Sequence, residues 1–234
     1  QPMILGSIMH EAMEEWLRTN RTADFVALFD AAFAKTCREK HLPAGFRLEV
    51  ERTTNRVIAG KVSVSDPWHP VSSAPEVEFE LPLLPSTLIK GRMDRLDRMS
   101  DTECVIVDYK SGRAKRVASF LQNRAKLQGP LYALAAREKF GLRTLAMMYV
   151  AVREDSRFGW GEVPGVELDL LPMPPDWIDA ARDLAIGRIG DLLAGLIEAH
   201  PTEEGDCRFC DFRDACHVKE DRPALVEIGG GASV

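Results

Sequence analysis

The chain has 234 residues, of which 45% are hydrophobic and 28% are charged. These proportions exclude an intrinsically disordered protein and fit one large globular domain, or a domain with a small appendage. The net charge of −6 excludes a protein that holds nucleic acid by positive charge over its whole surface, although a local basic groove remains compatible with it. The longest purely apolar run, residues 145–152, is too short to cross a bilayer, so we expect no membrane partner.

The start of the sequence and its cysteines indicate the setting of the protein. The chain opens with Gln1 rather than Met and shows no charged leader followed by an apolar segment, so we expect a cytoplasmic protein of which this is a fragment. Five cysteines form an odd set, and three of them lie within ten residues near the end. Without an export signal, this spacing indicates metal or cluster ligation rather than disulfides.

Hydrophobic periodicity predicts helices and strands in a definite order. Residues 7–18 and 23–40 have helical spacing of their apolar side chains. Strict alternation over residues 76–81 predicts a half-buried strand, and residues 87–98 predict a second strand after a turn. The continuous apolar run 104–107 is typical of a buried strand that delivers polar residues at its end.

The second half of the chain predicts a helix, a strand and a helix. Residues 120–140 form the first helix, closed by Gly141, and residues 145–152 form a buried strand. Residues 176–200 predict a long amphipathic helix. Its expected inward side chains are Trp177, Ala181, Leu184, Ile189, Leu192, Leu193 and Leu196. Together these elements predict a mixed α/β domain.

Two carboxylates and a lysine are the candidate catalytic residues. Asp94 and Asp108 lie on neighbouring expected strands, and Mg²⁺ prefers such oxygen ligands while keeping several waters. Asp108 and Lys110 are two residues apart on an extended strand, so their side chains emerge on the same face. The ammonium of Lys110 can then orient an attacking water or contact a phosphate oxygen. Taken singly, each residue is explained at least as well by strand-end solvation or by a surface ion pair, such as Asp94 with Arg92 or Arg95.

This Asp…Asp-x-Lys arrangement resembles the PD-(D/E)XK nuclease superfamily, and further motifs resemble its RecB-like branch. The motifs are Gly6-x-x-x-His10, Glu76-x-x-Phe79, Gly91-x-x-Asp94 and Gln128-x-x-x-Tyr132. Any one of them is weak, but their order and approximate spacing fit the family from residue 6 to residue 216. The resemblance implies a restriction-endonuclease-like core, in which a central mixed β-sheet is flanked by helices.

The resemblance also implies a role for each residue of the site. In the family, the equivalents of His10, Asp94 and Asp108 bind a catalytic Mg²⁺ or Mn²⁺ ion, together with the backbone carbonyl of the residue equivalent to Tyr109. The equivalent of Lys110 is the catalytic lysine, and the equivalent of Glu76 supports the acidic site. The equivalents of Gln128 and Tyr132 face the DNA and the active site. These two residues are four apart and therefore share one face of a helix.

A basic stretch follows the candidate lysine. Between Lys110 and Lys126 the sequence has no acidic residue. Its cationic residues are Arg113, Lys115, Arg116, Arg124 and Lys126, which we expect to bind DNA phosphates. A solvated loop and helix face is the alternative interpretation.

The three clustered cysteines form a candidate iron–sulfur site. Cys207, Cys210 and Cys216 have the spacing of soft metal ligands, and Zn²⁺ or an iron–sulfur cluster would accept them. In RecB-like nucleases of the AddB type, the same C-terminal triplet binds a [4Fe–4S] cluster, with a fourth cysteine from upstream. Here the fourth ligand is not identified: it precedes Gln1 in a longer protein, Cys37 replaces it, or the site is incomplete.

From these features we expect a nuclease domain over residues 1–200, a cysteine-bearing segment over 201–222 and a disordered tail over 223–234. The expected activity is that of a metal-dependent deoxyribonuclease, a RecB-type exonuclease acting on single strands or duplex ends in DNA repair and recombination. The resemblance implies a helicase subunit or domain as a partner. Gly60-Lys61 is followed by Val62 and no nucleotide-binding loop is recognisable, so the motor of such a helicase would lie elsewhere. A catalytically silent module that binds DNA or a helicase is the alternative.

Overall fold

The computed structural model describes residues 2–43, 45–47, 49–51, 53–54, 66–121, 127–196, 207 and 210. The chain divides into two compact units, Gln1–Ile186 and Gly187–Val234, and the sheet and the candidate site lie in the first. No helix among the described residues is both long and apolar enough to cross a membrane.

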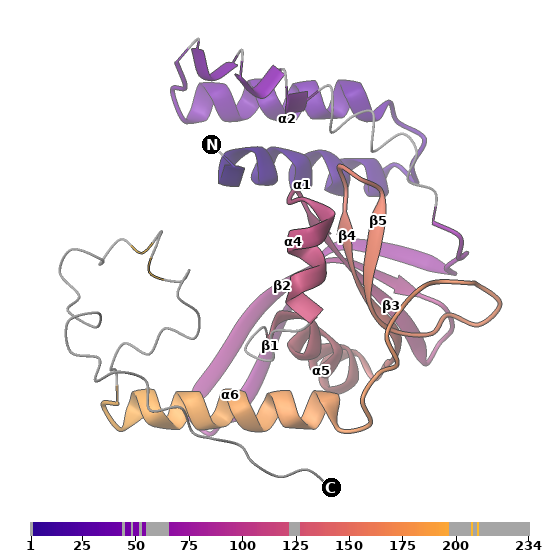
Figure 1. Ribbon diagram of the computed structural model, residues 1–234, viewed down its shortest axis with the longest axis vertical. Coiled ribbons are helices and arrows are strands. Elements are labelled where there is room, and N and C mark those ends of the chain that lie inside the picture. The colour runs from indigo at the N-terminus through magenta and orange to yellow at the C-terminus, as the bar shows by residue number, and fades with distance from the viewer. Residues whose placement is uncertain are drawn as a thin grey trace, which may run out of the picture. The chain divides into compact units, whose positions relative to one another are not determined.

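Two packed helices form the N-terminal layer. Helix α1 spans Pro2–Arg18 and helix α2 spans Phe25–Glu39, and they pack against each other with α1 between α2 and the sheet (Figure 1). Asp24 caps α2 by accepting a hydrogen bond of 3.0 Å from the amide of Val26, which satisfies one of the free donors of the first turn. The two predicted helices are therefore confirmed, and α1 begins several residues earlier than expected.

A mixed five-stranded sheet lies at the centre, in the order β1-β2-β3-β4-β5. The strands are β1 (Ser72–Leu84), β2 (Thr87–Arg98), β3 (Glu103–Lys110), β4 (Arg143–Ala151) and β5 (Ser156–Gly161). Strands β3 and β4 are parallel, and the other neighbours are antiparallel. The predicted fold class, a mixed sheet flanked by helices, is confirmed.

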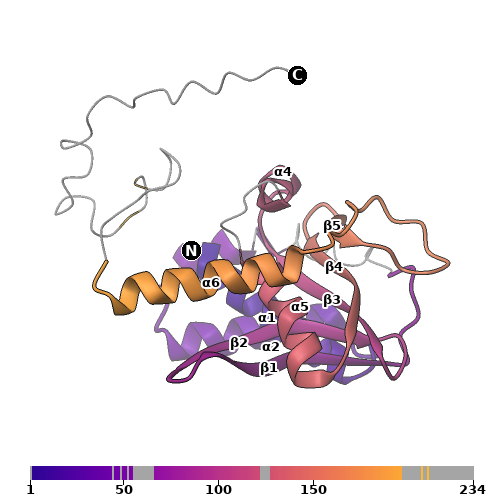
Figure 2. The ribbon, with the colours of Figure 1, turned by 90° about the horizontal axis from the view of Figure 1, so that it is seen from below.

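The crossover from β3 to β4 differs from the single helix predicted over residues 120–140. It contains helix α4 (Ala114–Ala118), a 3₁₀ turn (Ser119–Leu121) and helix α5 (Gln128–Phe140), and Figure 2 shows α4 and α5 as separate helices. Pro130 has no amide proton for an upstream carbonyl, so it is accommodated where it lies, in the first turn of α5. Gly141 ends α5 with φ of +64°, as the sequence predicts.

Strand β5 is not expected from the sequence. It contains two glycines, which weaken the local strand pattern. These glycines are required by the neighbouring strand, since a Cβ atom at Gly159 would lie 2.0 Å from the carbonyl oxygen of Met147. The two glycines weaken the strand pattern in the sequence, but the same glycines allow β5 to pair with β4.

The predicted burial of the last helix is only partly correct. Helix α6 spans Trp177–Leu193, and its first half contributes Ala181 and Ala185 to the core. The leucines expected to face inward are exposed: Leu184 (37%), Leu192 (62%), Leu193 (66%) and Leu196 (65%). Helical spacing places these residues on a stripe, but it does not supply a surface for the stripe to pack against.

The alternation of β3 separates the core from the site. Val105, Val107 and Tyr109 face α1 and α2 in the main hydrophobic cluster. Asp108 and Lys110 face the opposite side of the sheet, where α5 packs. The predicted shared face of Asp108 and Lys110 is therefore present in the structure.

A buried ionic cluster lies on the same sheet face as Tyr109. Arg95 is 1% exposed and donates to Asp97 at 2.7 Å, to Asp66 at 2.7 Å and to the hydroxyl of Tyr109 at 3.0 Å. The indole of Trp68 donates to Asp97 at 2.7 Å. Arg95 is thus bound to partners other than Asp94, which projects from the opposite face of β2.

The free energy of unfolding is expected to depend on pH through Asp66. Burial raises the pKa of Asp66, whereas the charges of Arg95, Arg21 and Arg157 and a hydrogen bond from Arg95 lower it. The lowering effects are larger together, so the pKa lies below the ordinary 3.8. Such a carboxylate stabilises the fold above its unfolded pKa and loses this effect as the pH falls through the folded pKa. We expect Asp66→Asn to cost about 3 kcal/mol at pH 7, and this cost to shrink below about pH 4.

Urea unfolding of both proteins at a series of pH values measures this difference. The exposed turn residue Asp101 supplies a control, because Asp101→Asn is expected to leave the free energy of unfolding unchanged. A cost of Asp66→Asn that stays constant down to pH 3 would contradict the role assigned to the ionised carboxylate.

Candidate active site

Charged side chains from four elements meet beside the C-terminal end of β3. Helix α1 contributes His10, strand β1 contributes Glu76, and strand β2 contributes Asp94. Strand β3 contributes Asp108 and Lys110, and Gln128 opens helix α5 on the same side of the sheet. The structure therefore gathers residues that are more than one hundred positions apart in the sequence.

Three of these residues converge on one point. One ligand atom from each of His10, Glu76 and Asp94 lies within 4.8 Å of the other two. Nδ1 of His10 is 3.3 Å from Oδ1 of Asp94 and 3.9 Å from Oε1 of Glu76. One imidazole and two carboxylates so close together form a donor set for a divalent cation. We name these three residues the ligand triad.

Glu76 reaches the triad through an unusual backbone conformation. Alternation along β1 puts Glu76 and Glu78 on the same face, yet Glu78 is exposed and the Glu76 side chain is only 9% exposed. The φ angle of Glu76 is +50°, a region that residues other than glycine rarely adopt. The carboxylate then lies between His10 and Arg92, whose Nε atom is 2.5 Å from Oε2 of Glu76. Strain of this kind is typical of functional positions.

The variant Glu76→Gly is expected to have a higher free energy of unfolding than the variant Glu76→Ala. Both Glu76→Gly and Glu76→Ala remove the carboxylate, but alanine keeps the unfavourable φ, so we expect Glu76→Gly to be more stable by about 1 kcal/mol. At Glu78, on the extended part of the same strand, the order should be reversed, with glycine less stable than alanine by about 0.5–1 kcal/mol. Chemical unfolding of the four variants tests this, and the same order at both positions would contradict the strain at Glu76.

Asp108 and Lys110 form an ion pair next to the ligand triad. Nζ of Lys110 lies 2.5 Å from Oδ2 of Asp108, and the Asp108 side chain is fully buried. The ammonium donates to Oε1 of Gln128 at 3.1 Å and lies 5.6 Å from the centre of the Tyr149 ring. Oδ2 of Asp108 has the Lys110 ammonium as its partner, and it forms no further hydrogen bond within the described part of the chain. A carboxylate oxygen has two lone pairs, so this atom retains capacity for a further cation.

Gln128 links the ion pair to α5. Its Nε2 group donates to Oδ1 of Asp108 at 2.8 Å and to the hydroxyl of Tyr132 at 2.8 Å. The Tyr132 hydroxyl in turn donates to the backbone carbonyl of Arg92 at 2.8 Å. The amide thus presents its oxygen to the ammonium and its nitrogen to the carboxylate, the orientation that satisfies both charges. The shared helical face predicted for Gln128 and Tyr132 is present.

The electrostatics of the site favour a bound cation. Burial opposes the charge of His10, but hydrogen bonds and attraction from Asp94 and Glu76 prevail and raise its pKa to about 10. Burial and the nearby charge of Asp94 raise the pKa of Asp108, although Lys110 and His10 partly offset this. Without a cation, the site therefore retains protons on groups that would otherwise bind a metal. Burial also raises the pKa of Tyr132, which keeps its hydroxyl a donor.

The predicted metal ligands are only partly grouped together. His10 and Asp94 belong to the ligand triad, and Glu76, expected to support the site, is its third member. Asp108 lies beside Lys110 and Gln128 rather than within the triad. The amide of Tyr109 donates to Oδ2 of Asp94 at 2.7 Å, so this part of β3 is held against Asp94.

Two further residues reach the site without having been predicted as part of it. Arg92 contacts the carboxylate of Glu76, and the ring of Tyr149 lies beside the ammonium of Lys110. Neither residue carries a family motif of its own, so only the folded chain brings them to the site.

A groove of about 780 Å³ leads from the triad along α1. His10, Glu76 and Arg92 are among its lining residues. Glu11, Glu14 and Glu15 of α1 also line it, and Lys35 is 2.8 Å from Glu11. The triad is therefore open to solvent through a passage whose glutamates are partly neutralised by neighbouring cations.

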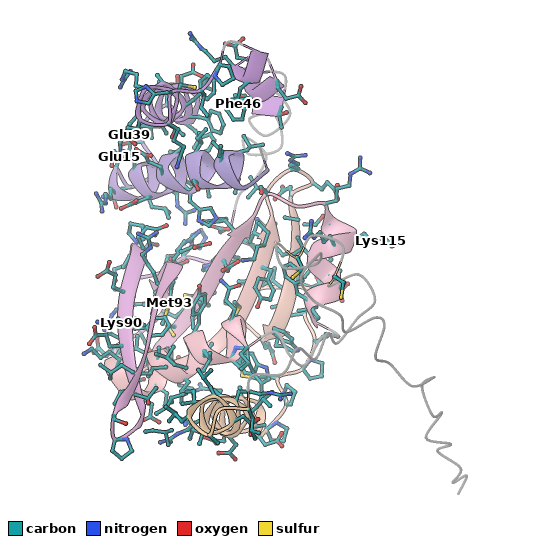
Figure 3. All side chains as sticks on the ribbon, turned by 90° about the vertical axis from the view of Figure 1, so that its left-hand side faces the viewer. Glu15, Glu39, Phe46, Lys90, Met93 and Lys115 are labelled. Carbon is teal, nitrogen blue, oxygen red and sulfur yellow. The ribbon has the colours of Figure 1, made fainter. Side chains whose placement is uncertain are left out.

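The predicted DNA-binding residues lie partly within the described structure. Arg113, Lys115 and Arg116 are exposed on and next to α4, where Figure 3 labels Lys115. Helix α4 is tied down by Glu154, which accepts a hydrogen bond of 2.9 Å from the amide of Ala114. Arg124 and Lys126 lie outside the described residues.

The cysteines are described incompletely. Cys207 is half-buried and Cys210 is exposed, both with free thiols, and Cys216 lies outside the described residues. Cys37 packs against the cluster of α1 and α2, and Cys104 is buried in β3. The predicted segments 201–222 and 223–234 also lie outside the described residues, apart from Cys207 and Cys210.

The model of one protein family, the PD-(D/E)XK nuclease superfamily, matches residues 1–217. The chain belongs to this superfamily. A stretch of 121 residues is 31% identical to one of the subunits of an ATP-dependent helicase/deoxyribonuclease from Streptococcus mutans. The match covers 46% of this chain and 11% of that protein, so the chain corresponds to a small part of its relative.

Membership of the PD-(D/E)XK superfamily agrees with the residues gathered at the site. The resemblance to this family, and to its RecB-like branch, is confirmed by the family match and by the similarity to the Streptococcus mutans protein. A crystal structure of a protein designated SSO0001 aligns over 89% of this chain and 84% of its own, with 12% identity and a TM-score of 0.39. A likeness at that level adds nothing to the assignment.

Proposed function

We propose that this nuclease domain is a metal-dependent deoxyribonuclease that hydrolyses phosphodiester bonds. The observation that carries the proposal is that the ligand triad lies next to the pair of Asp108 and Lys110, with Asp94 of the triad bonded to the backbone of β3. A structural ion pair has no need of a neighbouring imidazole and two further carboxylates, whereas metal-assisted hydrolysis uses such groups to hold the cation.

The residues present fit a hard divalent cation, Mg²⁺ or Mn²⁺. His10, Glu76 and Asp94 would hold it, with a carboxylate oxygen of Asp108 and the backbone carbonyl of Tyr109 as the further ligands that the family resemblance implies. When bound, such an ion lowers the pKa of a coordinated water and neutralises charge on phosphate.

Lys110 then has a defined task within this proposal. Its ammonium is held by Asp108 and Gln128, which fixes its position in the site. A fixed cation of this kind stabilises the charge that develops on a phosphate oxygen, and it can orient the attacking water. Gln128 keeps the ammonium in place and so completes the site.

Cleavage assays with purified protein test the activity. Labelled single strands, blunt duplexes and circular single strands are incubated with EDTA, and then with Mg²⁺ or Mn²⁺ in excess. We expect cleavage only with the added metal, and the absence of cleavage of the circles would indicate a RecB-type exonuclease. Binding of DNA without cleavage under all conditions would favour the alternative, a catalytically silent module.

The wider setting is also a proposal. The similar protein from Streptococcus mutans is named as part of a helicase/deoxyribonuclease. We therefore propose that this domain acts in DNA repair and recombination together with a helicase subunit or domain. Co-purification of the full gene product with a helicase tests this, and a complete gene product that is monomeric and has no helicase region would contradict it.

The basic residues of α4 are expected to contribute to DNA affinity through phosphates. Lys115→Gln with Arg116→Gln should weaken binding to all sequences alike and reduce the slope of log K against log salt by about 1–2 units. Fluorescence anisotropy at several salt concentrations measures the slope. Replacing the exposed Lys90 of β2 by glutamine is the matched control, and an unchanged slope in the double variant would exclude α4 from the interface.

We further propose that Cys207, Cys210 and Cys216 bind a [4Fe–4S] cluster, with Zn²⁺ as the alternative. The free thiols of Cys207 and Cys210 support the proposal, since soft ligands at this spacing suit either metal. Anaerobic purification of the complete gene product, followed by iron, sulfide and zinc determination, distinguishes them. A product that contains none of these would contradict both.

A further inference from the structure

Phe79 and Gly91 are paired across the hairpin of β1 and β2, and the phenylalanine ring covers the glycine. A Cβ atom at position 91 would lie 2.3 Å from Cζ of Phe79 and 2.8 Å from Cε1, distances that no real contact allows. Gly91 is therefore needed for the room it leaves, because any side chain at this position would displace the ring.

The ring of Phe79 packs against Tyr132 of α5. The two ring centres are 5.8 Å apart and the planes are inclined at 81°, which is the favourable edge-to-face arrangement. Phe79 is 4% exposed and Tyr132 is 7% exposed, so both rings are buried at this contact. The hairpin thus fixes the position of a tyrosine on a helix that belongs to another part of the fold.

Tyr132 is connected to Asp108 and Lys110 by hydrogen bonds through Gln128. Its hydroxyl donates to the carbonyl of Arg92, the residue after Gly91, and accepts from Gln128, with both distances 2.8 Å. Gln128 in turn contacts Asp108 at 2.8 Å and Lys110 at 3.1 Å. A continuous series of contacts therefore runs from Gly91 to the ammonium of Lys110.

We infer that Phe79, seated on Gly91, is a positioning residue for Lys110, acting through Tyr132 and Gln128. The inference rests on the proposed nuclease function and adds to it a residue that touches neither the ligand triad nor the ion pair. It also gives a physical reason why the motifs Glu76-x-x-Phe79, Gly91-x-x-Asp94 and Gln128-x-x-x-Tyr132 occur together. Each of them supplies residues to this series of contacts.

Phe79→Leu tests the inference because it keeps an apolar side chain and removes the ring. We expect kcat to fall about 10- to 100-fold, because a small displacement of a catalytic group has an effect of this size. The KM for DNA and the Kd for Mn²⁺ should stay within about twofold, since the triad is untouched. Gly91→Ala should lower kcat in the same way, and the double variant should be no worse than Phe79→Leu, because both changes act through one ring.

Leu81→Ala is the matched control for the core. Leu81 lies two residues further along the same face of β1 and is 2% exposed. We expect this variant to lose stability but to keep the wild-type kcat at temperatures where it is folded. If Leu81→Ala and Phe79→Leu lower kcat equally, Phe79 is only a core residue and the inference fails.

A second measurement separates this inference from the proposed activity. The ¹H–¹⁵N spectrum of the lysine ammonium groups, assigned with Lys110→Met, reports whether Lys110 is held. We expect its signal to broaden or disappear in Phe79→Leu and to persist in Leu81→Ala. An unchanged Lys110 signal in Phe79→Leu would overturn the inference. A wild-type protein that keeps the signal but cleaves no DNA would instead overturn the proposed function.

Discussion

Lys110→Met and Asp108→Asn are each expected to lower the kcat of DNA cleavage by about 10²–10³-fold or more, the effect of removing one preorganised electrostatic group from an active site. Each variant breaks the 2.5 Å contact between ammonium and carboxylate. The methionine keeps the unbranched chain of the lysine without its ammonium, and the asparagine keeps the shape of the carboxylate. Single-turnover cleavage with saturating Mg²⁺ measures the loss directly.

The same two variants should differ in stability in the metal-free protein. Lys110→Met leaves Asp108, a fully buried carboxylate, without its cation, which is expected to cost about 3 kcal/mol. Asp108→Asn leaves Lys110, which is 23% exposed and still bonded to Gln128, so the cost should be about 1 kcal/mol. Equal costs, or cleavage retained by Asp108→Asn, would contradict the proposed site. Lys90→Met, on the exposed edge of β2, is the control for the loss of a lysine.

Asp94→Asn is expected to weaken Mn²⁺ binding by at least about 100-fold. Loss of a group next to a metal ligand already lowers affinity 10- to 100-fold, and Asp94 contacts both His10 and the backbone of β3. Glu76→Gln should weaken binding by a similar factor if Glu76 is a ligand, as its place in the triad indicates. Isothermal titration calorimetry or electron paramagnetic resonance of Mn²⁺ measures both affinities.

Glu78→Gln supplies a matched control on the same strand. Glu78 is two residues from Glu76 and exposed, so its loss should leave the Mn²⁺ affinity unchanged. If Glu76→Gln and Glu78→Gln behave alike, Glu76 is not a ligand and only supports the acidic site. If Asp94→Asn binds Mn²⁺ as tightly as the wild type, the triad is not a metal site.

Several parts of the fold could be predicted because they depend on local patterns. The alternation before Phe79 defined a strand, and the spacing of Asp108 and Lys110 placed both side chains on one face. The spacing of Gln128 and Tyr132 placed them on one face of a helix. In each case the period of the element fixes the relation between residues that are close in the sequence.

Other parts of the fold depend on contacts with residues distant in the sequence, which a local pattern does not describe. Strand β5 forms because its glycines let β4 approach, and the leucines of α6 follow a helical stripe yet remain exposed. Arg95 is next to Asp94 in the sequence, but the pleat of β2 sends it to the opposite face, where Asp66 and Asp97 bind it. These outcomes are set by packing between segments that are distant in the chain.

The sequence by itself determined the family, most of the elements in their order and most residues of the candidate site, since motif spacing and periodicity are properties of short segments. Only the tertiary structure decided that Glu76 joins His10 and Asp94 as the third member of the triad, that Asp108 lies outside this triad, and that Phe79 is connected to Lys110. The physical reason is that these relations depend on one residue's φ angle, on strand register and on contacts across the sheet, none of which is encoded within a single motif.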